Sequence, residues 1–201
     1  MGKIIPLTHT GYSKNVEEQL EHEDVENAKA CFYASRDRLL DINMWQQLSG
    51  SFSSRFVLTD SDGLTALRRA RSGDYFKIKI PAPAPDDKFD WIAIEKIESK
   101  DDEQYQEVYM VVRAGHGPVN GRNSIDHDFS DVSTCVFSVK RIDNLVTAGV
   151  YGRNDEVDTN EVEGVMDTIR NAVIAFGAIS GLADFQWKNL MKGILDIPEE
   201  Q

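Results

Sequence analysis

Apolar and polar residues follow two different periods along the chain, and these periods divide it into three zones. Over residues 15–48 apolar side chains recur at steps of three and four, the spacing of one helical face. Over residues 51–153 they alternate in steps of two, as in YFKIKI at 75–80, the spacing of a β-strand. Helical spacing returns over residues 159–196. The pattern predicts a single domain, 1–201, with N-terminal helices, a central sheet and C-terminal helices.

Local signals refine these zones. Asn15 followed by Glu18 resembles a capping box and predicts the start of the first helix. The segment 3–8 has the composition of a short edge strand, and LTALRRA at 64–70 predicts a further strand. A hairpin turn is predicted at 142–144, where aspartate or asparagine tolerates a left-handed backbone.

The resulting order is a first short strand, two helices, six or seven antiparallel strands and a long C-terminal helix, which the glycines of GAISG at 177–181 should weaken or kink. This order, over most of the chain, resembles the helix-grip arrangement of START and polyketide-cyclase-like domains. The resemblance involves no diagnostic motif. It implies an α+β fold in which a curved antiparallel sheet wraps the C-terminal helix. A plain antiparallel sheet with helices on one face accounts for the same pattern.

Composition narrows the environment and the partners. At 201 residues and 41% hydrophobic, the chain can bury one core, and no apolar run reaches the roughly 18 residues of a membrane span. Cys31 and Cys135 lie in apolar patterns and are expected to be free thiols, which predicts a cytoplasmic protein. The net charge of −12, with one basic cluster at 68–71, argues against binding a nucleic-acid backbone.

The polar segment 114–131, AGHGPVNGRNSIDHDFSD, raises the question of metal, nucleotide or acid–base chemistry. Its glycines are spaced one residue too widely for a dinucleotide cradle, and no helix pattern follows them. Adjacent residues of an extended segment point to opposite sides, so its acids and histidines do not easily converge on one ion. No G-x-S-x-G nucleophile motif occurs in the chain. We expect an ordinary polar loop with no metal or cofactor, and retain as its polar candidates His116, Arg122, Asp126 and His127.

Aromatic residues on the predicted strands and the last helix suggest a different kind of site. Such side chains most often form a core, but on one sheet face they can also line a small-molecule site. The candidate ligand-binding residues are Tyr75, Trp91, Tyr109, Arg113, Tyr151 and Phe176.

The sequence therefore favours non-catalytic binding of an apolar or amphipathic small molecule between the sheet and the C-terminal helix. The first alternative is a protein-interaction or oligomerisation module that uses the apolar surface of residues 182–195, with a second copy of the chain as a partner. The second alternative is a metal-dependent or hydrolytic enzyme that uses the segment 114–131.

Overall fold

A seven-stranded antiparallel sheet forms the centre of the protein. The computed structural model describes residues 14–50, 54–79, 89–115, 117–118, 134–153 and 181–198. The strands run in the order β1-β7-β6-β5-β4-β3-β2, and each neighbouring pair is antiparallel. Their bounds are β1 (Lys14–Glu21), β2 (Arg55–Thr59), β3 (Tyr75–Lys79), β4 (Asp90–Asp101), β5 (Tyr105–Gly115), β6 (Thr134–Ile142) and β7 (Leu145–Arg153).

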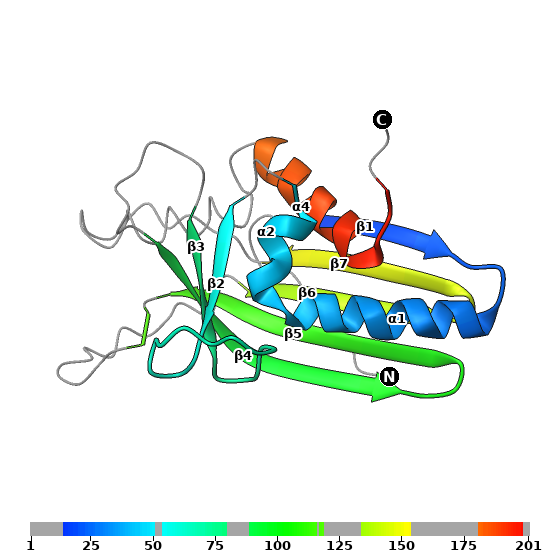
Figure 1. Ribbon diagram of the computed structural model, residues 1–201, viewed down its shortest axis with the longest axis horizontal. Coiled ribbons are helices and arrows are strands. Elements are labelled where there is room, and N and C mark those ends of the chain that lie inside the picture. Colours follow the sequence, from blue (N-terminus) through cyan, green and yellow to red (C-terminus); the bar gives the residue numbers. More distant parts are fainter. Residues whose placement is uncertain are drawn as a thin grey trace.

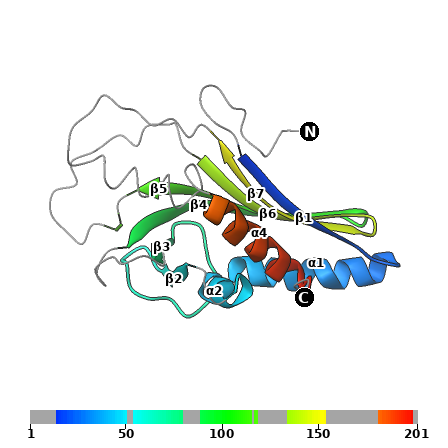
Figure 2. The ribbon, with the colours of Figure 1, turned by 90° about the horizontal axis from the view of Figure 1, so that it is seen from above.

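The described helices all lie on one face of this curved sheet (Figures 1 and 2). They are α1 (Val25–Leu40), the 3-10 turn η1 (Ile42–Met44), α2 (Trp45–Leu48) and α4 (Gly181–Leu195). Helix α4 packs on β1 and β7, α1 packs on β6 and β7, and η1 and α2 pack on β2. The predicted α+β fold is confirmed: a curved antiparallel sheet carries N-terminal helices and a C-terminal helix in the helix-grip order. We call the helix-bearing side of the sheet the inner face.

The first helix begins later than predicted, because residues 14–21 form strand β1 instead. Val16 and Leu20 are four residues apart, a spacing that suits one helical face and equally suits one face of a strand. Pairing with β7 decides between the two, since it satisfies the backbone of β1. The helix begins instead at Val25, where the Asp24 carboxylate caps it by accepting a hydrogen bond from the Asn27 amide at 2.7 Å.

The alternation of strand β4 is interrupted by a bulge at Glu95, where the register with β5 shifts between Ile94 and Lys96. A bulge leaves backbone groups without ladder partners and bends the strand. The residues before β3 bind backbone groups of β4 on both sides of this bulge. The Ser72 hydroxyl accepts a hydrogen bond from the Ile97 amide at 2.8 Å, and the Gly73 amide donates to the Ile94 carbonyl at 2.8 Å. The bulge is therefore also an attachment point for the β2–β3 connection.

The inner face is polar at the end formed by the β4–β5 and β6–β7 hairpins. Arg141 is fully buried there, and its guanidinium donates to the Gln106 side-chain oxygen at 2.7 Å and to the backbone carbonyls of Glu103 and Asp143. The Gln106 amide in turn donates to the Tyr33 hydroxyl of α1 at 2.7 Å. This network joins α1 to both hairpins and uses the donors of the Arg141 side chain within the fold.

Candidate functional site

Apolar side chains cover much of the inner face, and one part of this surface lies on the strands β3, β4 and β5. We consider two inward-pointing side chains from each of these strands, each at most 2% exposed to solvent. The register places them in neighbouring rows, so they form one continuous surface. None of them carries a charge, a hydroxyl or a thiol. The six residues, which we call the β3–β5 surface, are Phe76, Ile78, Ile92, Ile94, Met110 and Val112.

Beneath the described part of α4, side chains fill the interior. The Trp45 ring lies 5.4 Å from that of Phe56 and 5.0 Å from that of Phe137, and Trp187 of α4 lies 5.5 Å from Phe137. The Trp45 indole N–H donates to the Leu39 carbonyl at 3.1 Å. Such a closely packed aromatic cluster has no room for a further molecule without rearrangement. The prediction of a ligand between the sheet and the C-terminal helix stays a prediction, and these contacts show that aromatic side chains pack closely next to Trp187.

Five of the predicted ligand residues share one face of the sheet, as the sequence pattern requires. Tyr75 is in register with Ala93 and Ala93 with Arg113, while Trp91, Tyr109 and Tyr151 alternate with inward-pointing neighbours. This face is the outer one, opposite to the helices. The structure thus brings these residues to a common surface but turns them away from α4, and a ligand-binding role for them stays a prediction.

On the outer face, Trp91 is the centre of a small cluster. The Tyr75 ring meets it edge-on at 6.3 Å, and the Lys77 ammonium lies 4.5 Å from the indole centre in a cation–π contact. Gly117 lies flat against the indole, where a Cβ would collide with the ring. Arg113 pairs with Glu95, with 2.6 Å between Nε and Oε1. These contacts join the first residues after β5 to the sheet.

Tyr109 and Tyr151 are each engaged with a carboxylate. The Tyr109 hydroxyl donates to Glu98, which raises the pKa of this phenol. Tyr151 is only 4% exposed, and burial together with the nearby Glu17 carboxylate raises its pKa well above the ordinary range. Both phenols are thus held in the protonated form, and both act as hydrogen-bond donors within the sheet.

The remaining predicted site residues lie outside the described residues. These are Phe176 and the polar candidates His116, Arg122, Asp126 and His127. Within the described ranges, no group of three or more histidine, cysteine or acidic side chains is placed to hold a metal ion. Cys31 and Cys135 are not joined by a disulfide bond, and burial raises the pKa of the Cys31 thiol. No helix in the described part of the chain has the length and apolar character to cross a membrane.

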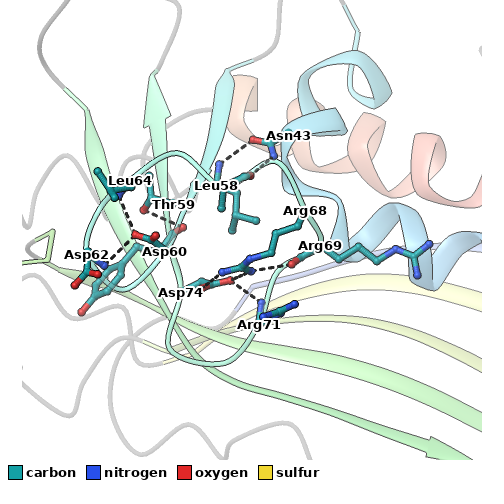
Figure 3. A network of polar contacts seen from close by, with 12 residues as sticks. Asn43, Leu58, Thr59, Asp60, Asp62, Leu64, Arg68, Arg69, Arg71 and Asp74 are labelled. Carbon is teal, nitrogen blue, oxygen red and sulfur yellow. Dashed lines mark hydrogen bonds and ion pairs between the residues drawn. The ribbon is translucent and has the colours of Figure 1, made fainter.

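The connection between β2 and β3, residues 60–74, does not form the strand that the sequence pattern predicted there. It was predicted to contain a strand at 64–70, but its pairing is limited to one bridge between Thr59 and Thr65. Its middle is held instead by one side chain of η1. The Asn43 side-chain oxygen accepts a hydrogen bond from the Leu58 amide at 3.0 Å, and its NH2 group donates to the Ala66 carbonyl at 2.9 Å (Figure 3).

Both ends of this loop are also tied down (Figure 3). At its start, the Asp60 carboxylate accepts a hydrogen bond from the Leu64 amide at 2.9 Å. At its end, the Asp74 carboxylate accepts from the Arg68 guanidinium at 2.6 and 2.9 Å and from the Arg71 amide at 2.8 Å. The Asp74 side chain is 7% exposed, so a buried acid receives three hydrogen bonds from the loop that precedes it.

Comparisons with known proteins add little to this geometry. No family model matches the sequence, and no curated protein matches it. Among solved structures, the chain is similar to the hypothetical protein jhp0584 from Helicobacter pylori, with 10% identity, a TM-score of 0.48 and coverage of 91% of this chain and 86% of that one. It is also similar to Ara h 8.0201, with 11% identity, a TM-score of 0.37 and coverage of 92% and 99%. At these scores the similarities carry no inference about function.

Proposed function

We propose that this protein binds an apolar or amphipathic small molecule without acting on it, and that the apolar part of the molecule lies between the β3–β5 surface and the C-terminal helical segment. The support is the continuity of that surface, where six apolar side chains from three strands adjoin without a polar group among them. Ligand sites for such molecules are lined mainly by aliphatic and aromatic side chains. The same six side chains include no acid, base or nucleophile, so they can hold an apolar group but supply no chemistry.

The close packing around Trp45 limits where the molecule can lie. The aromatic cluster and the C-terminal half of α4 occupy the inner face over β6, β7 and β2. The β3–β5 surface adjoins this cluster through Phe76, whose ring lies 5.7 Å from that of Trp45. A bound molecule would therefore contact the edge of the aromatic cluster and extend along the strands away from it.

The experiment uses two adjacent valines of β5 as a matched pair. Val112 is fully buried on the inner face, whereas Val111 is half-buried on the outer face. Native mass spectrometry of the purified chain tests for a retained molecule, and titration with the amphipathic dye anilinonaphthalene sulfonate tests for a saturable site. Val112→Trp fills the proposed space and is expected to weaken dye binding at least about tenfold, a loss within the range for displacing one apolar contact surface. Val111→Trp is expected to leave binding unchanged.

Stability measurements on the same variants make the result decisive. If the space is available to a ligand, Val112→Trp folds and loses binding. If side chains already fill it, Val112→Trp destabilises the chain by overpacking and the wild type shows neither a retained molecule nor saturable dye binding. Ile78→Phe makes a smaller addition to the same surface and gives the answer if the tryptophan variant does not fold. Equal effects of Val111→Trp and Val112→Trp on binding would also count against the proposal.

The interaction module that the sequence left open requires a different surface from the one predicted. Among the α4 side chains that the structure describes, Leu190, Met191, Ile194 and Leu195 are each at most 1% exposed and belong to the core of the same chain. Phe185, by contrast, is 60% exposed. An interface on this helix therefore has little apolar surface to offer, and exposed apolar residues elsewhere become relevant.

A further inference from the structure

The loop 60–74 exposes two large aliphatic side chains on a firmly held backbone. Leu64 is 65% exposed and Leu67 is 89% exposed, the highest value among the large apolar residues that the structure describes. Both leucines lie on the same loop, three residues apart in the sequence. We propose that this loop is a self-association surface, which pairs with the same loop of a second copy of the chain about a twofold axis.

The first argument is that the loop is ordered before any partner binds. Its backbone is fixed by Asn43 in the middle and by the carboxylates of Asp60 and Asp74 at its two ends. Its last residues are bonded to the bulge of β4 through Ser72. Association therefore does not have to order this segment, which removes one of the main costs of binding through a loop.

The second argument is the distribution of charge along the loop. Asp60 and Asp62 lie at the end next to Leu64, while Arg69 and Arg71 lie at the opposite end (Figure 3). A surface with acids on one side and arginines on the other is complementary to itself when turned by a half-rotation. Each copy then places its acids opposite the other's arginines, which is the condition for a closed dimer.

The charges best placed for such pairs are Asp62 and Arg71. Both are exposed, and within the described part of the chain neither side chain takes part in an ion pair. Arg68 and Arg69 already pair with Asp74 and Asp37 respectively. The net charge of −12 argues against an anionic membrane as the occupant, because the chain as a whole is repelled by such a surface. At physiological ionic strength the same repulsion between two copies is screened beyond about 8 Å, so a small local interface remains feasible.

Sedimentation velocity over micromolar to millimolar protein concentrations tests the proposal. The wild type is expected to show a reversible monomer–dimer equilibrium. Leu67→Ser is expected to raise its dissociation constant at least about tenfold, since each dimer loses two buried leucines. Phe185→Ser removes an exposed apolar residue from α4, away from the loop, and is expected to leave the equilibrium unchanged (Figure 1).

Charge reversal tests the twofold geometry itself. Asp62→Arg places arginine opposite arginine and Arg71→Asp places acid opposite acid, so each variant alone is expected to be monomeric. An equimolar mixture restores both oppositely charged pairs and is expected to form a heterodimer. A wild type that stays monomeric throughout, a dimer that Leu67→Ser does not weaken, or a mixture that fails to associate would each overturn the proposal. Binding of a monomeric wild type to vesicles of anionic lipid would also overturn it and assign the leucines to a membrane.

Discussion

Replacing Asp74 by alanine should destabilise the protein far more than replacing another aspartate of the same loop. The Asp74 carboxylate is almost fully buried and accepts hydrogen bonds from the Arg68 guanidinium and the Arg71 amide. Asp62 lies in the same loop but is exposed, and no hydrogen bond to its carboxylate is found in the described part of the chain. The two substitutions remove the same group from different surroundings, so their difference measures what the contacts of Asp74 contribute.

The magnitude follows from the exposure of each partner. The Arg68 side chain is 32% exposed, so water screens its pair with Asp74, and we assign it about 1 kcal/mol. The hydrogen bond from the Arg71 amide to a buried carboxylate contributes about 1.5 kcal/mol. Asp74→Ala should therefore lower the free energy of unfolding by about 2–3 kcal/mol, and the Tm by about 5–10 °C for a chain of this size. Asp62→Ala should change it by less than about 0.5 kcal/mol.

Urea denaturation gives these free energies, and a double-mutant cycle with Arg68→Ala isolates the ion pair. We expect a coupling energy of about 1 kcal/mol between Arg68 and Asp74. Hydrogen exchange of the amides of residues 60–72 should quicken in Asp74→Ala and stay unchanged in Asp62→Ala. Equal stability of the two alanine variants would refute the reasoning, because it would mean that the buried carboxylate does not hold the loop.

Three further predictions concern other parts of the fold. The pKa of Tyr151 is raised in the folded protein, so its protonated phenol stabilises the fold fully below about pH 10, the ordinary phenol pKa. This contribution to the free energy of unfolding is lost as the pH rises above that value. Denaturation of Tyr151→Phe between about pH 9 and 11 should thus show a weaker alkaline decline than the wild type, and an identical decline would contradict this cause. Gly193→Ala should cost about 1–3 kcal/mol by urea denaturation, because the new Cβ would collide with the Leu48 carbonyl; an unchanged midpoint would show that α4 can shift freely. Asp143 has a φ of 52°, so Asp143→Val should lower stability by about 1–2 kcal/mol while Asp143→Gly does not, and thermal unfolding that ranks them the other way would contradict the assignment of the turn.

The parts of the fold that the sequence predicted are those in which one period dominates. The alternation in YFKIKI correctly predicted which residues of β3 point to each face of the sheet. The turn at Asp143 was also predicted correctly, between β6 and β7. Strand β1 was missed because Val16 and Leu20 satisfy both periods, and a partner strand more than a hundred residues away decides between them. No local pattern contains that information.

The sequence could not predict on which face of the sheet the candidate ligand-binding residues lie. Alternation indicates which residues share a face of the sheet, but not which face the helices cover. On β5 and β6 both faces include apolar residues, and Val136 on the outer face is as fully buried as Phe137 on the inner one. Tyr75 and Trp91 were therefore correctly grouped, but the side of the sheet could not be deduced. The loop 60–74 was misassigned because its backbone bonds to Asn43 and to the β4 bulge, which are remote in sequence.

The contacts that Asn43 makes have a consequence for how whole molecules can meet. Strand β2 ends the sheet, and the outward-facing amide of Leu58 is occupied by the Asn43 side chain, while its carbonyl accepts a hydrogen bond from the Ala66 amide at 2.9 Å. A foreign strand arriving at this edge finds the N–H and the carbonyl of Leu58 already bonded, so it cannot pair with β2 at that residue. Recognition of a neighbouring molecule at Leu58 therefore depends on side chains.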